Sequence, residues 1–414
     1  MILSGCPDQI RAAGHSRKRK RTTRLPARAR PSPCGGAGAA QGKRTGKALV
    51  GEMDLLDNKT IISASSPAER EHHIRSLLPE LKAAGTFQPA TSYHVIWFLT
   101  VFCIYAGSYA VLLTDPGWPP RTAAIVIVAV MMMQLGLFAH EVGHGAITTH
   151  MRWRSAMGLV SNSLLVGFSY SYWQSTHSRH HNHPNAEGID PDMESLGYAL
   201  YERAAQRSRG LPRVVARLQP FSVWVGFIAW GAAIKIDGMI YLVRNLGRRT
   251  AADVGCIVAH FVLWLVVPMT VVSPRTALIN YASMTVLNGL YMAAILVVPH
   301  VGTGTQAPDQ QLPFFVRQVR YSRNYDSSWL GTLLCGGLNL QIEHHLLPHV
   351  PCMRLRRAKP IIASYCIKHG LPYEQVSYWE AWRQVLAHLR RMSLIVRGED
   401  RIDTTLTPAS RRAA

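Results

Sequence analysis

The chain has 414 residues and carries 45 Lys and Arg against 24 Asp and Glu, a formal net charge of +21. With 48% hydrophobic residues, it is neither a disordered polyelectrolyte nor a collagen-like chain. The seven cysteines are scattered without paired spacing, which argues against a disulfide framework and a cysteine-based zinc site.

The N-terminal segment concentrates the basic charge. Residues 1–52 hold 12 Lys and Arg and only two acids. Their RKRKR run matches a nuclear-localisation or nucleic-acid patch loosely, and the Arg-rich composition also resembles an organelle transit peptide. Because the apolar content is low, we interpret residues 1–52 as a basic disordered extension, or as upstream sequence that is not translated, with Met53 as the start. We expect no cleavable signal peptide, since no apolar core is present.

Four apolar blocks are each long enough to cross a bilayer, which takes about 20 residues. Residues 95–114 and 122–139 form one predicted hairpin, and residues 253–272 and 277–298 form a second. The sequence therefore predicts an all-α integral membrane protein with four spans in two helical hairpins.

Two further apolar segments are ambiguous. Residues 155–173 are rich in Ser and Gly. Residues 221–242 contain Lys235 and Asp237 near their middle, and such charges are costly at the bilayer centre. We interpret both segments as interfacial or re-entrant.

The distribution of basic residues orients the hairpins. Residues 145–251, between the hairpins, hold 12 Lys and Arg, whereas the link inside each hairpin holds one. Because basic residues stay on the cytoplasmic side, we expect this segment and both termini there, and no nucleic-acid partner. The predicted order is an N-terminal cytosolic segment, a membrane domain and a C-terminal cytosolic tail, at residues 53–94, 95–360 and 361–414.

Three histidine clusters carry the strongest chemical signal. HEVGH (140–144) directly follows the second span, HSRHH occupies residues 177–181, and QIEHH occupies residues 341–345. In each cluster the spacing places the side chains on one face of a helix. All three clusters fall on the predicted cytoplasmic side.

The number of imidazoles limits the metal. The clusters supply seven, whereas one tetrahedral zinc ion takes only three or four ligands. We therefore predict two metal ions. Imidazole suits iron, copper, zinc and nickel, but the apolar surroundings favour a redox pair that oxidises an aliphatic chain with dioxygen.

The boxes HxxxH, HxxHH and QxxHH, in this order around two hairpins, resemble those of the membrane fatty acid desaturases. GGLNLQIEHHLLPHVP (336–351) is especially similar to the third box of front-end desaturases, in which Gln replaces the first histidine. HSRHHNHPNAEGIDPDME (177–194) resembles their second box. The resemblance covers about residues 90 to 360 and implies a cytosolic, helical, histidine-rich di-iron domain that caps the hairpins.

The resemblance also implies which residues hold the two iron ions. A further histidine follows the fourth span in this family, and His300 stands at that place, although Pro299 precedes it and no Asn lies four residues before it. Gln341 occupies a ligand position, where it acts through water or by supporting a ligand. The implied iron ligands are His140, His144, His177, His180, His181, His300, His344 and His345.

Other polar residues receive lesser roles. Candidates for hydrogen bonds to the ligand imidazoles are Asp190, Asp192, Asn185 and Glu343. Candidates for lining an acyl chain are Met131, Met132, Met133 and Trp173. The histidines that we interpret as loop, surface or packing residues are His183, His150, His349 and His260.

The implied reaction introduces a cis double bond into a fatty acyl chain with O2 and two electrons, a step of fatty acid biosynthesis. The acyl carrier is left open between coenzyme A, a carrier protein and a membrane lipid. The HPGG motif of a fused cytochrome domain is absent from the sequence. The implied electron donor is therefore a separate ferredoxin or cytochrome system, which the Arg-rich surface would steer if it is acidic.

The sequence leaves two alternative functions open. HEVGH also satisfies the HExxH pattern of zinc metalloproteases, with Glu141 as the general base. That hypothesis leaves the other two clusters unexplained. Di-iron hydroxylases and ketolases share related boxes, but the string LNLQIEHH favours an acyl desaturase.

Overall fold

The computed structural model describes residues 67–194 and 197–399, which belong to the compact unit Asn58–Ala414. The predicted extension (1–52) lies outside the described residues. The part of the chain that is described is mostly helical, as predicted. It contains one pair of short parallel strands, β1 (Asn324–Asp326) and β2 (Gln375–Ser377).

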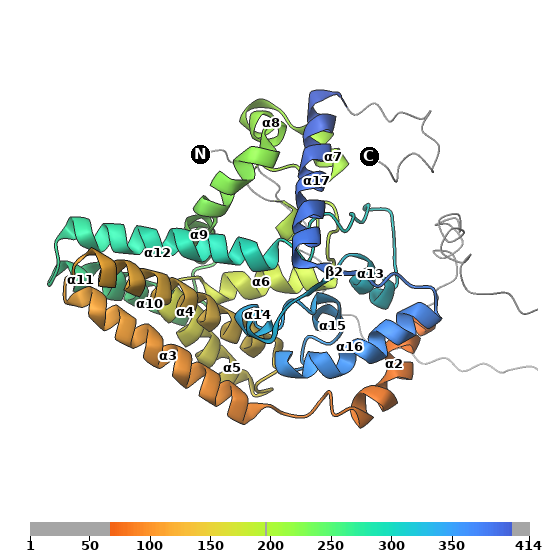
Figure 1. The fold of residues 1–414 in the computed structure, drawn as a ribbon, viewed down its shortest axis with the longest axis horizontal. Helices are drawn as coiled ribbons and strands as arrows, with labels where there is room; N and C mark the ends of the chain where they lie inside the picture. Colours follow the sequence, from red (N-terminus) through yellow and green to blue (C-terminus); the bar gives the residue numbers. More distant parts are fainter. Residues whose placement is uncertain (1–66, 195–196, 400–414) are drawn as a thin grey trace, which may run out of the picture. The chain divides into compact units, whose positions relative to one another are not determined.

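The first predicted hairpin consists of α3 (Thr91–Leu113) and α4 (Trp118–His144), which pack along each other (Figure 1). Proline in the first turn of α4 suits its start, because the missing N–H has no helical partner there. Gly145 takes the left-handed conformation with φ 76° and ends the helix immediately after His144. The first histidine box therefore sits in the last turn of a long apolar helix.

The second hairpin is built from a continuous helical segment and the helix that follows it. The segment Ala251–Met269 comprises α10 (Ala251–Phe261), the π-helix η4 (Val262–Val266) and α11 (Val267–Met269). Next comes α12 (Pro274–Leu296), whose first turn is capped by the Ser273 hydroxyl accepting from the Thr276 N–H. Since α12 also packs against α4, the two hairpins share one core.

Five helices of the described residues are long and apolar enough to cross a membrane. Four of them coincide with the predicted spans. The fifth is α9 (Gln219–Arg244), which covers the segment that we interpreted as interfacial or re-entrant. The Lys235 ammonium on α9 is buried and donates to the Val166 carbonyl at 2.6 Å, so its charge faces protein.

The helix α9 crosses α12 at a pair of glycines. A Cβ atom added to Gly231 would lie 2.3 Å from the Thr285 carbonyl oxygen, and one added to Gly289 would lie 2.7 Å from the Gly231 nitrogen. Both obstacles are backbone atoms that cannot rotate away. The two helices therefore approach this closely only because both positions lack a side chain.

Short helices connect the first hairpin to α9. They are α5 (Met151–Gly158), the π-helix η2 (Leu159–Val166), α6 (Tyr170–Asn182), the 3₁₀ helix η3 (Pro191–Met193), α7 (Glu202–Arg207) and α8 (Gly210–Arg217). The ambiguous segment 155–173 forms the end of α5, all of η2 and the start of α6, so it is no single long helix.

The helices before the first hairpin and after the second form a smaller core around Phe315, Ile342 and Leu355. The helices that contribute to this core are α2 (Pro67–Ala83), α13 (Phe314–Arg320), α15 (Gln341–Leu346) and α16 (Cys352–Lys368). Two further helices also follow the second hairpin, α14 (Trp329–Leu334) and α17 (Tyr378–Arg397). Of these, α17 packs instead on α7, α8 and α9. The third histidine box is α15 itself.

Candidate metal centre

The structure gathers all eight predicted histidine ligands into two groups whose ligand nitrogens lie within 4.8 Å of one another. We call the first the five-histidine group; its members are His140, His144, His177, His181 and His344. We call the second the three-histidine group; its members are His180, His300 and His345. A third candidate group among the described residues shares His180 with the second and adds the carboxylates of Asp190 and Asp192.

Helix α6 joins the two groups. His177 and His181 lie one turn apart and face the five-histidine group, whereas His180 faces the three-histidine group. Helix α15 divides in the same way, because adjacent His344 and His345 project about 100° apart around a helix. The neighbouring pairs in the second and third boxes therefore serve different sites.

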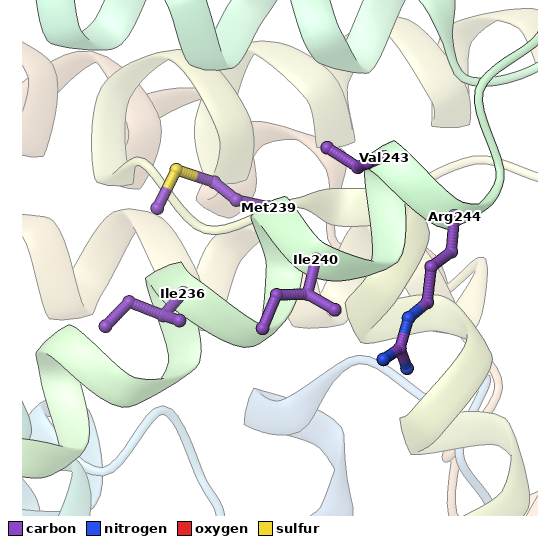
Figure 2. A pocket seen from close by; sticks show the side chains of 5 residues that line it. All are labelled: Ile236, Met239, Ile240, Val243 and Arg244. Atoms are coloured by element: carbon purple, nitrogen blue, oxygen red, sulfur yellow. The ribbon is translucent and has the colours of Figure 1, made fainter. Parts of the chain in front are cut away.

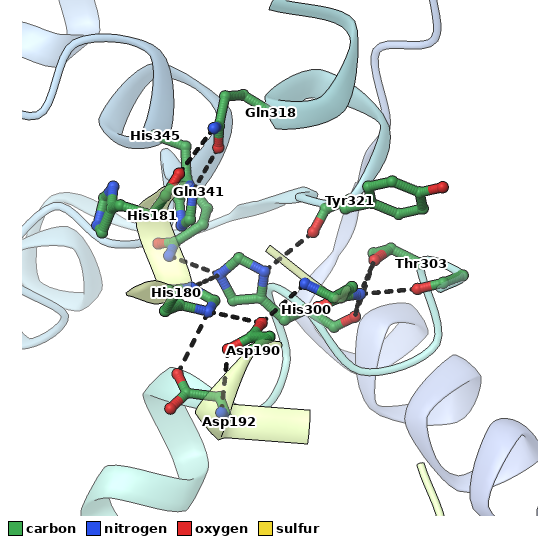
Figure 3. A network of polar contacts seen from close by, with 12 residues as sticks. His180, His181, Asp190, Asp192, His300, Thr303, Gln318, Tyr321, Gln341 and His345 are labelled. Carbon is green, nitrogen blue, oxygen red and sulfur yellow. Dashed lines mark hydrogen bonds and ion pairs between the residues drawn. The ribbon is translucent and has the colours of Figure 1, made fainter. Parts of the chain in front are cut away.

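In the three-histidine group, the outer nitrogen (Nδ1) of each imidazole lies beside an oxygen atom that can only accept a hydrogen bond (Figure 3). The hydrogen of each neutral ring therefore sits on Nδ1. His180 Nδ1 lies 2.9 Å from Asp190 Oδ2, and His300 Nδ1 lies 2.9 Å from the Tyr321 carbonyl oxygen. Both Nδ1 atoms therefore carry hydrogen and donate outward. The two Nε2 atoms, 3.3 Å apart, point inward.

Gln318 does the same for His345. Its amide Nε2 donates to the His181 carbonyl at 2.8 Å, which turns its Oε1 toward His345 Nδ1 at 2.9 Å. His345 Nδ1 is therefore the donor, and its Nε2 is left with a lone pair. That buried Nε2 has no hydrogen-bond partner in the described structure.

These orphaned and facing lone pairs test whether a metal fits. His180 Nε2 and His300 Nε2 face each other at 3.3 Å, which suits a cation between them, whether a proton or a metal ion. In the five-histidine group, the Nε2 atoms of His144 and His177 are 2.9 Å apart, and those of His344 and His181 are 3.2 Å apart. Imidazole nitrogens that converge in this way are suitable ligands for iron, copper, zinc or nickel, so the residues present fit the implied metal ions.

Burial keeps these imidazoles neutral, which is the form that binds metal. It lowers the pKa of His177, His181, His344 and His345 well below the usual 6.5, with neighbouring imidazoles adding to the shift. Burial, assisted by the charge of His180, lowers the pKa of His300 to about 3.

His180 is the exception. Burial alone would lower its pKa, but the carboxylates of Asp192 and Asp190 outweigh burial and raise it to about 9. Asp190 is fully buried and also accepts the Asn185 N–H at 2.7 Å. The two acids therefore favour a cation at this imidazole, whether a proton or a metal ion.

The remaining predicted support residues lie in different places. Gln341 Nε2 is 2.9 Å from His300 Nε2, and its Oε1 is buried without a partner. Among the described residues, the Asn185 side chain forms no hydrogen bond with an imidazole; it donates to the carbonyl oxygens of His300 and Gly304. Glu343 accepts instead from Asn324 and Tyr373.

Glu141, the acid of the HExxH pattern, is turned away from both histidine groups. Its Oε2 accepts the Cys352 N–H at 2.8 Å and lies 3.3 Å from His94 Nε2. A metalloprotease needs this carboxylate beside the metal-bound water. Here it anchors the start of α16 to α4.

The structure also shows where the candidate acyl-lining residues and the remaining histidines lie. Trp173 stacks on His177, with ring centroids 4.6 Å apart and planes at 22°, and covers the five-histidine group on one side. Met132 and Met133 are buried in the core between the hairpins. Among the described residues, the histidines that join neither group include His150, His183, His260 and His349.

Gln318 and the Tyr321 carbonyl were not singled out from the sequence. Both lie in or just after α13, a short helix without a recognisable motif. Because their role depends on the packing of α13 against α15, no local spacing could have identified them.

Comparison with known proteins adds a further finding. The family model described as fatty acid desaturase matches residues 116–377, more than half of the chain and a range that includes every member of both histidine groups.

Individual relatives are distant. An acyl-lipid (9-3)-desaturase of Physcomitrium patens is 25% identical over 327 residues, which cover 74% of this chain and 60% of that protein. An acyl-lipid (8-3)-desaturase of Thraustochytrium is 25% identical over 368 residues, covering 84% and 82%. A Delta(8)-fatty-acid desaturase of Borago officinalis is 25% identical over 362 residues, covering 81% and 77%.

Proposed function

The chain belongs to the fatty acid desaturase family, and we propose that it is a membrane oxidoreductase that introduces a cis double bond into a fatty acyl chain. It uses O2 and two electrons at two histidine-held iron ions. The observation that carries this proposal is the pair of histidine groups sharing α6 and α15. A single-metal enzyme has no use for eight converging imidazoles.

The five-histidine group would hold one iron ion and the three-histidine group, with Gln341 beside it, the other. Iron bound there would supply the oxidising power to remove hydrogen from an unactivated C–H bond, which acidic and basic side chains lack. The protein's own task is to hold the ligand nitrogens in place. Asp190, Gln318 and the Tyr321 carbonyl keep a proton on each Nδ1 of the three-histidine group, so that each Nε2 stays available.

The topology of the chain supports four crossings rather than five. His144 ends α4, and His300 lies four residues beyond α12, yet both belong to the joined histidine groups. The chain between them must cross the membrane an even number of times. Of the three candidate spans in this interval, one therefore stays on the histidine side.

We assign that role to α9, because elements of the histidine side contact both of its ends. Trp224 near its start stacks on Trp382 of α17, and Tyr241 near its end packs on Tyr172 of α6. Its outer face carries a hollow of about 290 Å³ (Figure 2). The lining residues are Ile236, Met239, Ile240, Val243 and Arg244. An apolar face bordered by arginine suits a helix lying in the cytoplasmic membrane interface.

The substrate and the electron donor extend the proposal. Two of the relatives named above are acyl-lipid desaturases, which favours a lipid-linked acyl chain over coenzyme A or a carrier protein. The apolar bundle would hold the chain, and the Arg-rich segment 203–217 offers a surface for an acidic ferredoxin or cytochrome donor. The chain spans 60% of the length of the Physcomitrium patens desaturase, so the acyl carrier and the electron donor are proposals for this chain.

Expression in a host of simple fatty-acid composition, with mass-spectrometric mapping of new double bonds, tests the proposal. The wild type should produce an O2-dependent cis double bond and contain two iron ions per chain, whereas His180→Ala should lose the product. Glu141→Gln is the matched control, because Gln retains an acceptor for the Cys352 N–H and the desaturase should stay active. Hydroxylated product, His180→Ala acting like the wild type, or loss of activity in Glu141→Gln with metal intact would contradict it.

A further inference from the structure

The turn that precedes the second histidine box is enclosed by buried polar side chains from three apolar helices. It runs from Ser163 in η2 to Ser171 in α6. Burying polar groups is costly unless each is paired, so such a network holds the segment that it encloses in one place. None of them belongs to the two histidine groups.

Asp253 of α10 provides hydrogen-bond acceptors for the first turn of α6. Its carboxylate accepts the Ser171 N–H at 2.8 Å and the hydroxyls of Ser169 and Ser163 at 2.9 and 2.6 Å. The two hydroxyls accept in turn from the N–H groups of Tyr172 and Tyr170, at 3.1 and 3.0 Å. All three N–H groups that open the helix are thus paired, beside a negative charge that favours a helix N-terminus.

Three other side chains donate hydrogen bonds to the carbonyl oxygens at the end of η2. Lys235 of α9 donates to the Val166 carbonyl at 2.6 Å, and His260 Nδ1 of α10 donates to the Leu164 carbonyl at 2.9 Å. Between them, the Tyr105 hydroxyl of α3 donates to the Leu165 carbonyl at 2.9 Å. Three consecutive carbonyls are therefore held by three different helices.

The turn has no room to shift against these helices. Gly167 has a φ of +81°, and a Cβ atom there would lie 2.3 Å from His260 Nε2 and 2.5 Å from Lys235 Nζ. On the opposite flank, a Cβ on Gly238 of α9 would lie 3.1 Å from the Ser169 side chain.

We infer that Asp253, together with Lys235 and His260, positions the second histidine box for metal binding. This inference rests on the proposed metal centre. Helix α6 supplies ligands to both histidine groups, and each residue turns about 100° around the helix axis. A start displaced by a single residue would swing His177, His180 and His181 out of both groups. The contacts of Asp253 on α10 and Lys235 on α9 specify that start.

The test uses the full-length protein in detergent and measures metal per chain, the affinity for Co²⁺ and its visible absorption spectrum. Asp253→Asn should bind Co²⁺ about tenfold more weakly than the wild type and with an altered spectrum, as is typical when groups that orient ligands are lost. Lys235→Met should behave likewise, and Lys235→Arg, which retains a donor for the Val166 carbonyl, should restore binding.

Two controls separate positioning from general stability. Asp237→Asn makes the same chemical change at an exposed site on α9 and should bind like the wild type. Gly231→Ala should lower the unfolding temperature but leave the Co²⁺ spectrum unchanged, because it does not touch the turn.

The positioning role would be wrong if Asp253→Asn bound Co²⁺ with the affinity and spectrum of the wild type, or if Gly231→Ala changed both as much as Asp253→Asn does. Neither result would contradict the proposed metal centre. Failure of the wild type itself to bind two metal ions would instead overturn the proposed function, and this inference with it.

Discussion

At the scale of single residues, the site depends on the outer nitrogen of each imidazole. His180, His300 and His345 each donate from Nδ1 to an acceptor that has no proton to give, so Nε2 is the nitrogen that each turns toward the other two. Asp190 could be proposed from the sequence because it follows the second box closely. Gln318 could not, since it reaches His345 only through the packing of α13 on α15.

Gln318→Leu should therefore weaken metal binding, by about 10- to 100-fold, because His345 loses the acceptor that fixes its tautomer. Gln318→Glu keeps that acceptor and should bind metal more tightly than Gln318→Leu. Equilibrium competition with a chelator, followed by metal analysis, measures the change. Gln206→Leu, on the exposed side of α7, is the control. Equal affinity of Gln318→Leu and this control would contradict the role.

At the scale of helices, apolar length alone does not separate the four proposed spans from α9, which is also long and apolar enough to cross a membrane. The proposal that α9 stays on the histidine side depends on its contacts, with α17 near its start and with α6 near its end. Lys235 is a sequence feature that sets α9 apart from the other apolar helices, and its ammonium is buried against the Val166 carbonyl instead of facing lipid. The close crossing with α12 depends on two glycines that no periodicity marks.

Gly231→Ala should destabilise the protein by about 1–3 kcal/mol, because the added methyl group meets the Thr285 carbonyl oxygen at 2.3 Å and separates the helices. Gly255→Ala, on α10, is the matched control. Nothing lies within 4 Å of its added Cβ, so the higher helix propensity of Ala should stabilise it by up to about 1 kcal/mol. Thermal unfolding in detergent measures both. An unchanged unfolding temperature for Gly231→Ala would contradict the close crossing.

At the scale of the whole molecule, the histidine groups link stability to pH. The ligand histidines with lowered pKa stay neutral in the folded protein, whereas in the unfolded chain they take up protons below about pH 6.5. The unfolded state therefore binds more protons as the pH falls, and stability falls with it. His180 has the opposite sign: its stabilisation is complete below pH 6.5 and is lost as the pH rises toward 9.

Metal-free protein should consequently unfold at a lower temperature at pH 5.5 than at pH 7.5. Each neutral buried histidine contributes up to about 1.4 kcal/mol per pH unit below its unfolded pKa. Protein loaded with metal should unfold at a higher temperature than metal-free protein at each pH, but it should lose at least as much stability between pH 7.5 and 5.5, because the unfolded chain takes up the same protons and the metal displaces the proton of folded His180. The measurement is thermal unfolding after chelation and after metal loading. A metal-free unfolding temperature that stays constant or rises on acidification would contradict this linkage.

The sequence by itself determined the family and the histidines that come together: the three boxes at helical spacing predicted a fatty acid desaturase, which the family match confirms, and the structure gathers their imidazoles into two groups. The two imidazole-held metals at one membrane face stay a prediction. Local spacing suffices for the histidines, because ligands one turn apart share a face whatever the fold. Only the tertiary structure decided how adjacent histidines divide between the groups, why Glu141 is turned away and what holds α6 at its start. Those arrangements depend on contacts between helices far apart in the chain, which no local pattern records.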